Sequence, residues 1–298
     1  MIDINNYNIC DDIIVKVKPW ECNLCYNKII SHPNYCSQCY TFSDNYSIIN
    51  EADSRKKINK IDKIINVFNK QKKILLPVLS CKNEENFYYN IDILYEYYNK
   101  KKISGIFILS TFVDIETIIN IYNKTKKKYP DLWVGVNLIG ENIFKVFNFI
   151  KLNNPDGIWI DNSYLFDNKK LGIAEVILNQ FEKYNWNGLY FGGYMFKYQM
   201  NCNTYDNKLI KLLNQYLDIL TTSGDDTNIE ISDEKLNYIF NEAIQIPIAI
   251  ASGVNNNNLE KHVEKCNIII IRSSIVDSND NINKEKLDEI CNKLELIN

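Results

Sequence analysis

Short apolar runs alternate with longer amphipathic segments from residue 73 to the last residues of the chain. The runs are nearly continuous in apolar residues, and this pattern predicts strands that are buried on both faces of a parallel sheet. The segments between the runs carry apolar residues at three- and four-residue spacing, which predicts covering helices. The eight predicted strands are residues 74–80, 105–110, 132–140, 157–163, 188–196, 217–224, 246–253 and 267–274.

Eight strand–helix units in about 225 residues fit a closed (β/α)8 barrel, or TIM barrel, better than an open doubly wound sheet. A faint internal repeat supports this count, because Gly105, Gly157 and Gly188 each open a strand and permit a tight turn from the preceding helix. Pro77 is an exception within the first strand, where it removes a ladder donor, and we expect it to face a staggered end of the sheet. The predicted fold class is therefore α/β, with a (β/α)8 barrel as its main domain.

Four of the nine cysteines form two C-x-x-C pairs, Cys22 with Cys25 and Cys36 with Cys39. Each pair can place two thiolates on one cation from a tight turn, and two pairs complete a tetrahedral site for Zn²⁺. His32 lies between the pairs as an alternative ligand, although a loop role is favoured. Four unligated thiols are the other alternative, but so short and polar a segment gains little order without a metal. We predict a zinc ribbon or knuckle whose closed site is structural rather than catalytic.

A basic segment, residues 55–72, follows the cysteines and carries apolar residues on one helical face. A basic helix beside a zinc ribbon suits an RNA or an acidic protein partner. The favoured alternative is that its charges are solvated while its apolar stripe packs on the next domain. The stripe consists of Ile58, Ile61, Ile64, Ile65 and Phe68. The expected domains are 1–54 (zinc-ribbon-like module), 55–72 (basic amphipathic linker helix) and 73–298 (barrel).

Composition excludes several classes of protein. The 298 residues are 46% hydrophobic and 24% charged, as in ordinary globular proteins, and the net charge is −3. This balance argues against attraction of the whole protein to nucleic acid or to an anionic membrane. No apolar run approaches the roughly 18 residues of a membrane span, and the first residues lack the layout of a signal peptide. We therefore expect a soluble cytoplasmic protein.

Polar residues follow the predicted strands at their carboxyl ends, where barrels of this kind carry their sites. The last three ends, Ser223–Gly224, Ser252–Gly253 and Arg272–Ser273–Ser274, combine small residues with hydroxyls and backbone amides. These are the features of a phosphate cradle, and Arg272, one of two arginines in the chain, adds a cation. The alternative is that each Ser-Gly pair only makes a tight turn, although three in consecutive units favour phosphate.

Two charged residues at strand ends are candidates for chemistry. Asp161 suits a general base or a metal ligand, and Lys197 suits an electrostatic clamp or a Schiff-base amine. The alternatives are a helix cap for Asp161 and a surface ammonium for Lys197. His262 lies in a late helical pattern and is expected at the surface, which disfavours a histidine-based mechanism.

Five of the runs together resemble the BtpA/SgcQ proteins, a family of TIM barrels in the ribulose-phosphate-binding barrel superfamily. They read YPDLWVGVNLIG, DGIWIDN, GLYFGGYMFKYQ, LDILTTSG and PIAIASGV, and the resemblance covers about residues 73–276. It implies a phosphate-bearing small ligand but no particular reaction. Its motif positions are Asn137, Asp161, Asn162, Lys197, Ser223, Gly224, Ser252 and Gly253.

The loop after the sixth strand departs from the family. Where the family continues as SG-x-G-T-G, this chain has Asp225 and Asp226 after Ser223–Gly224. Two carboxylates beside a phosphate repel it unless a cation bridges them. Either this loop binds Mg²⁺, or it has lost the family's contact with its ligand.

Two functions follow from these observations. The leading hypothesis is an enzyme, a lyase, isomerase or transferase, that acts on a phosphorylated sugar or nucleotide-like metabolite. Its expected catalytic residues are Asp161, Lys197 and Asn137. The alternative is a non-catalytic assembly protein that recruits a protein or RNA partner through the zinc ribbon and basic helix. The expected ligand-binding residues are Asn162, Ser223, Gly224, Ser252, Gly253, Arg272 and Ser273.

Overall fold

The chain forms two compact units, residues 1–50 and 51–298, in a computed structural model. In the first unit the structure describes two antiparallel strand pairs, β1 (Trp20–Glu21) with β2 (Lys28–Ile29) and β3 (Tyr35–Cys36) with β4 (Thr41–Phe42). In the second unit it describes residues 59–297, except 70, 72, 82–83, 112, 164–171, 198–204 and 244–245.

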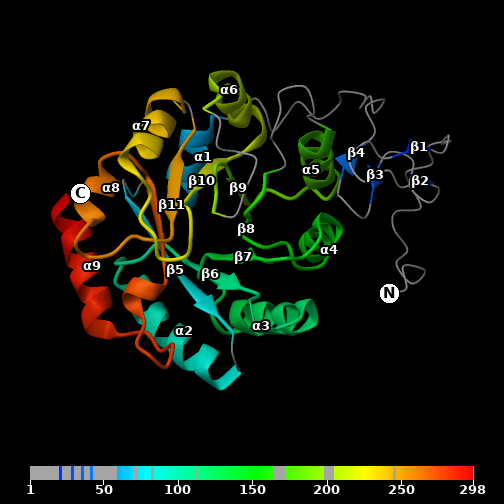
Figure 1. Cartoon of the computed structure of the whole chain (residues 1–298). Coiled ribbons are helices and arrows are strands. Elements are labelled where there is room, and N and C mark those ends of the chain that lie inside the picture. Colours follow the sequence, from blue (N-terminus) through cyan, green and yellow to red (C-terminus); the bar gives the residue numbers. More distant parts are fainter. Residues whose placement is uncertain are drawn as a thin grey trace. The chain divides into compact units, whose positions relative to one another are not determined.

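The second unit is a closed barrel of eight parallel strands (Figure 1). Each strand pairs with its sequence neighbour, and the last strand pairs with the first. All eight predicted apolar runs contain an observed strand, so the predicted (β/α)8 barrel is confirmed. The strands are β5 (Ile74–Ser80), β6 (Ile106–Leu109), β7 (Val134–Asn137), β8 (Gly157–Ile160), β9 (Leu189–Gly193), β10 (Ile219–Thr222), β11 (Ile248–Ala251) and β12 (Ile268–Ile271).

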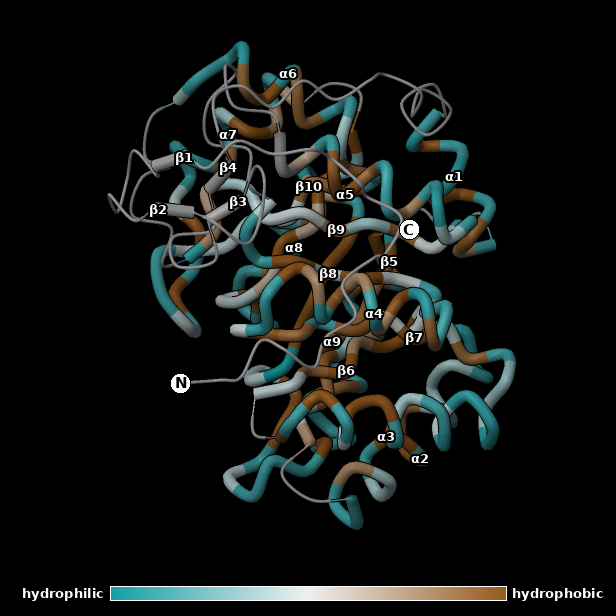
Figure 2. The backbone as a smooth tube through the Cα atoms, turned by 90° about the vertical axis from the view of Figure 1, so that its right-hand side faces the viewer, coloured by the Kyte–Doolittle hydropathy of each residue, from teal (hydrophilic) through white to brown (hydrophobic). Residues whose placement is uncertain are grey.

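Helices follow the strands and form the outer layer of the barrel (Figure 1). Figure 2 shows the apolar positions on the strands and the hydrophilic positions on the outer turns. None of the described helices has the length and hydropathy needed to cross a bilayer. The helices are α1 (Lys60–Val67), α2 (Glu84–Asn99), α3 (Ile115–Lys128), α4 (Ile143–Asn153), α5 (Gly172–Lys183), α6 (Asn207–Tyr216), α7 (Asp233–Glu242), α8 (Leu259–Val263) and α9 (Lys284–Ile297), with the short 3-10 helix η3 (Ser273–Ile275).

Aromatic side chains fill the interior of the barrel. Phe107 lies among the rings of Trp133, Trp159 and Phe191, with ring centroids 5.4, 5.5 and 5.0 Å away. These side chains and the aliphatic residues beside them are buried in one cluster. The lumen is therefore a packed core, and a ligand has room only at its ends.

The glycine repeat at the strand starts has a packing cause. A Cβ atom at Gly105 or Gly157 would lie 2.8 or 2.6 Å from the ring of Trp133, and one at Gly188 would lie 2.5 Å from the ring of Trp186. Glycine is thus required beside large indoles at these positions. Pro77 pairs with Ile271 at the last position of the β12 ladder, and the ladder with β6 begins at the next residue.

Helix α1 covers the amino-terminal end of the barrel. Its Ile64, with the following Phe68, belongs to the cluster inside the barrel, and the Phe68 and Trp133 rings are 5.2 Å apart. The apolar-stripe prediction is correct for these two residues and wrong for Ile61, which is 45% exposed. Ile65 is half-buried, and Ile58 lies outside the described residues.

Two lysines of α1 are not solvated as predicted. Lys63 Nζ lies 2.8 Å from one carboxylate oxygen of Asp218, and Lys60 Nζ lies 3.6 Å from the other. Asp218 immediately precedes β10 and is buried. Lys63 also donates to the carbonyl oxygen of Gly188, which precedes β9. These contacts fasten α1 to the amino-terminal ends of two strands.

The closure by α1 predicts unequal effects of two isoleucine substitutions. Ile64→Ala should lower the free energy of unfolding by about 2–5 kcal/mol, because it leaves a cavity at the end of the barrel core. Ile61→Ala removes the same atoms from an exposed site of the same helix and should change it by less than about 0.5 kcal/mol. Chemical denaturation measures both, and equal losses would contradict the closure.

Candidate functional site

Polar side chains lie at five of the eight strand ends that form the last layer of the lumen. Trp159 and Ile270 belong to the apolar interior cluster. Side chains two residues apart on a strand face the same side, so Asp161 and Arg272 also face the lumen. They lie at the carboxyl ends of the strands, which we call the mouth of the barrel. The lumen-facing residues at the carboxyl ends, from β5 to β12, are Ser80, Leu109, Asn137, Asp161, Gly193, Ser223, Gly253 and Arg272.

The carboxyl group of Asp161 lies at this mouth and accepts a hydrogen bond from the side-chain amide of Asn137. The residue is half-buried, and the Nδ2 of Asn137 donates to its Oδ1 at 2.9 Å. Desolvation above the apolar lumen raises the pKa of Asp161, while the Asn137 hydrogen bond and the charge of Lys197 act in the opposite direction. A carboxyl group with a raised pKa can hold and release a proton closer to neutral pH, as general acid–base chemistry requires.

A glycine on the neighbouring strand allows the strand ends to approach at Asp161. A Cβ atom on Gly193 would lie 1.8 Å from the backbone oxygen of Asp161, so no other residue fits at this position without a backbone shift. Asn162 follows and is half-buried. The predicted strand-end residues Asn137, Asp161 and Asn162 therefore lie together in the structure.

Lys197 reaches the same mouth from the loop after β9. Its backbone N–H donates to Ser223 Oγ at 2.9 Å, and its Nζ donates to Thr227 Oγ1 at 3.2 Å. The loops after β9 and β10 are joined by these two bonds. The charge of Lys197 acts on the pKa of Asp161, and the role of Lys197 as an electrostatic clamp stays a prediction.

Lys235 is a site residue that sequence reasoning missed. It lies in the first turn of α7, is buried, and donates from Nζ to the carbonyl oxygen of Ser223 at 2.9 Å. The sequence carries a signal for it, since a lysine in the first turn opposes the helix dipole, where Asp233 and Glu234 are the favoured residues. This hydrogen bond holds the backbone of the turn after β10 against helix α7.

The two Ser-Gly pairs after β10 and β11 are brought together by the segment between them. A Cβ atom on Gly224 or Gly253 would lie 2.2 or 2.3 Å from the carbonyl oxygen of Ile229. Ser252 Oγ accepts a hydrogen bond from the backbone N–H of Asn228 at 2.9 Å. Both glycines thus have a packing role in these turns, and phosphate binding by the pairs stays a prediction.

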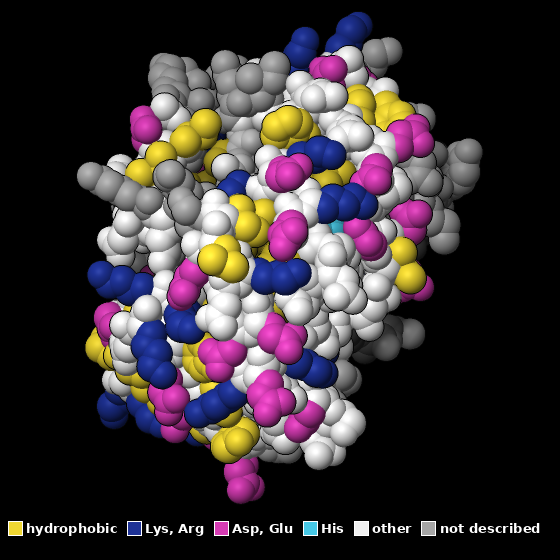
Figure 3. Space-filling view, turned by 90° about the vertical axis from the view of Figure 1, so that its left-hand side faces the viewer, with side chains coloured by type: hydrophobic (Ala, Val, Ile, Leu, Met, Phe, Trp, Pro, Cys, Tyr) yellow, Lys and Arg dark blue, Asp and Glu magenta, His cyan; other side chains and the backbone are white. Residues whose placement is uncertain are grey.

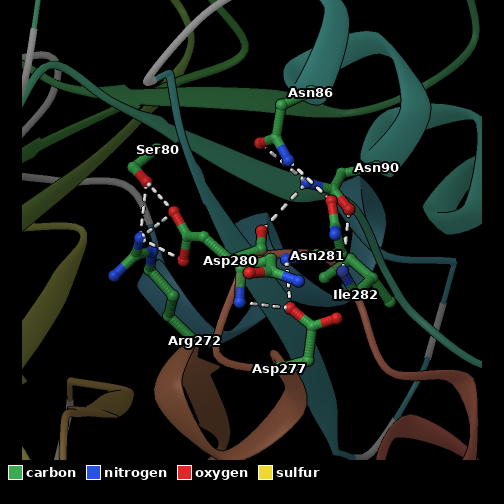
Figure 4. A network of polar contacts seen from close by, with 9 residues as sticks. Ser80, Asn86, Asn90, Arg272, Asp277, Asp280, Asn281 and Ile282 are labelled. Carbon is green, nitrogen blue, oxygen red and sulfur yellow. Dashed lines mark hydrogen bonds and ion pairs between the residues drawn. The ribbon is translucent and has the colours of Figure 1, made fainter.

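Arg272 is paired within the protein (Figure 4). Its Nη2 lies 2.5 Å from each carboxylate oxygen of Asp280 and 2.6 Å from Ser80 Oγ. Ser80 Oγ donates in turn to Asp280 Oδ2 at 3.0 Å. Sequence reasoning missed Asp280, although a rare arginine at a strand end suggests a carboxylate partner. Ser273, the first residue of η3, is exposed.

His262 corrects an expectation, because it is fully buried in α8 rather than at the surface. Its Nε2 lies 3.1 Å from Glu230 Oε1, and burial lowers its pKa despite the opposing charge of Glu230. It belongs to the helical layer and not to the lumen-facing residues of the mouth.

The predicted metal sites remain predictions. Cys22, Cys25 and Cys39 lie outside the described residues, and the backbone of Cys36 ends β3. Within the described part of the chain, no three His, Cys, Asp or Glu side chains gather to form a metal site. Asp225 and Asp226 are exposed, and Lys235 Nζ lies 3.8 Å from Asp225 Oδ1.

No family model matches the sequence, and no curated protein matches it. Membership of the BtpA/SgcQ family therefore stays a prediction.

Solved structures show a likeness in fold. KGPDC from Streptococcus mutans in complex with D-ribose 5-phosphate has a TM-score of 0.57 at 10% identity, covering 76% of this chain and 99% of that one. N-(5'-phosphoribosyl)anthranilate isomerase from Pyrococcus furiosus has a TM-score of 0.51 at 12% identity, covering 75% and 99%. The YdjI aldolase from Escherichia coli has a TM-score of 0.51 at 12% identity, covering 80% and 92%. The barrel fold is thus shared with these proteins.

The desolvated position of the Asp161 carboxyl predicts a stability difference that depends on pH. Because its pKa is raised in the folded state, the folded protein binds a proton where the unfolded chain has lost it. Asp161 therefore lowers stability as pH rises above about 4, the ordinary carboxyl value. Asp161→Asn keeps the Oδ1 acceptor and should be more stable than the wild type at pH 7, with the difference vanishing at lower pH.

Asp233 supplies a control of opposite sign. Its hydrogen bond with Lys261 lowers its pKa, so Asp233→Asn should be less stable than the wild type at pH 7. Thermal melting of the three proteins from about pH 3.5 to about pH 8 measures both differences, because this range extends from the ordinary carboxyl pKa to neutrality. An Asp161→Asn protein that is no more stable at pH 7 would show that the carboxylate is well solvated or fully compensated.

Proposed function

We propose that the carboxyl end of the barrel binds a phosphorylated sugar or a related metabolite, and that Asp161 transfers a proton to or from it. The observation that carries this proposal is the desolvated carboxyl group of Asp161, held by Asn137 at 2.9 Å over an apolar lumen. A carboxylate in this setting costs folding free energy, so its presence at a strand end favours a chemical role.

The neighbouring residues suit a proton transfer next to a carbonyl or hydroxyl group. Asn137 orients the Asp161 carboxyl, and Lys197 stabilises negative charge that develops on the ligand. Isomerase chemistry, and lyase chemistry that proceeds by proton transfer, use these elements without an additional nucleophile. The backbone around Ser252, Gly253 and Ser273, after the last two strands, would hold the phosphate.

The shared fold supports the choice of ligand. One of the similar barrels is bound to D-ribose 5-phosphate, and another is named as an isomerase of a phosphoribosyl compound. The resemblance of five sequence runs to the BtpA/SgcQ barrels points to the same ligand class. We propose membership of that group of barrels on this basis.

Recruitment of RNA by the basic helix has less support. Lys60 and Lys63 of α1 both contact the carboxylate of Asp218 and are not available to a phosphate backbone. On the face drawn in Figure 3, basic and acidic side chains are interspersed rather than gathered by sign. A nucleic-acid surface is expected to be a continuous basic patch.

We also propose a structural zinc ion in residues 1–50. Each C-x-x-C pair falls in sequence within a pair of antiparallel strands, since Glu21 pairs with Lys28 and Cys36 pairs with Thr41. Four thiolates are a donor set suited to Zn²⁺. Cys22, Cys25, Cys36 and Cys39 would hold it, and it would supply folding free energy rather than catalysis.

The proposed ligand class predicts a specific thermal shift. D-ribose 5-phosphate at about 100 times its Kd should add about 2.7 kcal/mol of stability, a shift of several degrees, and D-ribose should not. Lys197→Met should weaken binding about tenfold, whereas Lys208→Met, an exposed lysine of α6, should leave it unchanged. Absence of a shift with D-ribose 5-phosphate and other sugar phosphates would contradict the proposal.

The proton transfer is tested separately by isotope exchange. Incubation of a bound ketose or aldose phosphate in D₂O should place deuterium on a carbon beside its carbonyl, as followed by NMR. Asp161→Asn should slow this exchange by about 100-fold or more while binding persists. Equal exchange rates in both proteins would remove Asp161 from the reaction.

The zinc proposal predicts about one zinc ion per chain by elemental analysis. Cys36→Ser should lose the metal, because three thiolates hold Zn²⁺ less tightly than four. Cys10→Ser, which lies outside the two pairs, should keep it. Zinc below about 0.1 per chain in the wild type purified without chelators would contradict a structural site.

A further inference from the structure

An ion pair lies at the mouth of the barrel between the ends of β12 and β5. Both oxygens of the Asp280 carboxylate lie 2.5 Å from Arg272 Nη2, and Ser80 Oγ contacts both partners (Figure 4). The Asp280 side chain is 8% exposed, and that of Arg272 is 30% exposed. An anionic group of the protein itself thus lies against the arginine that was predicted to hold a phosphate.

The contacts of Arg272 with Asp280 and Ser80 are all made by Nη2, and this limits what the guanidinium can still bind. A guanidinium offers two paired donor edges to an oxyanion, Nη1 with Nη2 and Nε with Nη2. Nη2 belongs to both edges, and its two hydrogens are taken by Asp280 and Ser80. Neither edge is therefore available to a phosphate while Asp280 stays in place.

The backbone around Asp280 is anchored without the help of its carboxylate. Its carbonyl oxygen accepts from Asn90 Nδ2 at 3.1 Å, and the N–H of Ile282 donates to Asn90 Oδ1 at 2.7 Å. Asp277 Oδ1 accepts from the N–H groups of Asn279 and Asn281 in the same turn. The carboxylate can therefore leave Arg272 by side-chain rotation while the turn remains docked on α2.

We propose that Arg272 and Ser80 supply the side-chain donors of the phosphate site, beside the backbone of Ser252, Gly253 and Ser273. In the unliganded protein Asp280 occupies these donors, and a phosphomonoester binds by displacing the Asp280 carboxylate. The inference rests on the proposed function, since it names the place of the ligand's phosphate. A phosphate dianion carries more charge and more acceptor oxygens than a carboxylate, so it can compete for the same donors. The buried hydroxyl of Ser274, which has no hydrogen-bond partner among the described residues, lies two residues further along the chain.

Substitution of Asp280 tests the competition directly. Asp280 has a φ of +66°, a conformation that Asn and Gly tolerate best, so Asp280→Asn and Asp280→Gly should both fold. Both remove the internal anion and should bind D-ribose 5-phosphate about tenfold or more tightly than the wild type. Asp277→Asn removes the same charge from the same turn without contacting Arg272 and should change the affinity by less than about twofold. Calorimetric titration of the full chain at fixed salt measures all four proteins.

The outcomes separate this inference from the proposed function. Tighter binding by both Asp280 variants but not by Asp277→Asn is the expected result. Unchanged binding would overturn the competition, and weaker binding would show instead that Asp280 positions Arg272 for the ligand. If neither the wild type nor any variant binds a sugar phosphate, the proposed function fails and the inference falls with it.

Discussion

The packed interior of the barrel is the constraint on which the candidate site depends. Phe107 and the rings around it leave no passage through the lumen, and α1 covers its amino-terminal end. A ligand is therefore confined to the carboxyl ends of the strands. The same packing places the carboxyl group of Asp161 over apolar atoms, which is the cause of its raised pKa. The packed lumen thus explains both the position of the candidate site and the raised pKa of Asp161.

Desolvated carboxylates lie at both ends of the barrel, and their partners differ. At the amino-terminal end Asp218 contacts Lys60 and Lys63, so two cations compensate its charge. At the carboxyl end Asp161 accepts from the neutral amide of Asn137, with the charge of Lys197 as the smallest of the three influences on its pKa. The first arrangement fastens a helix to two strands, while the second leaves a carboxyl group that can change its protonation state. This contrast between Asp218 and Asp161 is the one expected between a structural carboxylate and a carboxylate that takes part in chemistry, and it supports the proposed role of Asp161.

The sequence allows the fold to be predicted further than the site. Continuous apolar runs mark all eight strands because both of their faces are buried, and the strand ends point to Asn137, Asp161 and Arg272. The residues that contact these strand ends are harder to predict. Asp280 lies in a loop and Lys235 in a helix, and no periodic pattern in the sequence indicates that either segment reaches the mouth. His262 is wrongly expected at the surface because a short helix gives too few positions to define its buried face. The isoleucine stripe of α1 fails at Ile61, in the first turn of the helix, because periodicity marks one face of a helix but does not show how far along that face the packing extends.

Mapping a bound sugar phosphate onto the backbone by NMR tests the central claim most directly, because the two ends of the barrel serve as an internal comparison. Titration with D-ribose 5-phosphate should shift the amide signals of Asp161, Gly193 and Ser223 at the carboxyl ends of the strands. The signals of Asp218 and of α1, at the opposite end of the packed lumen, should stay in place. Shifts centred on α1, or spread over the barrel without a focus at the mouth, would contradict the account.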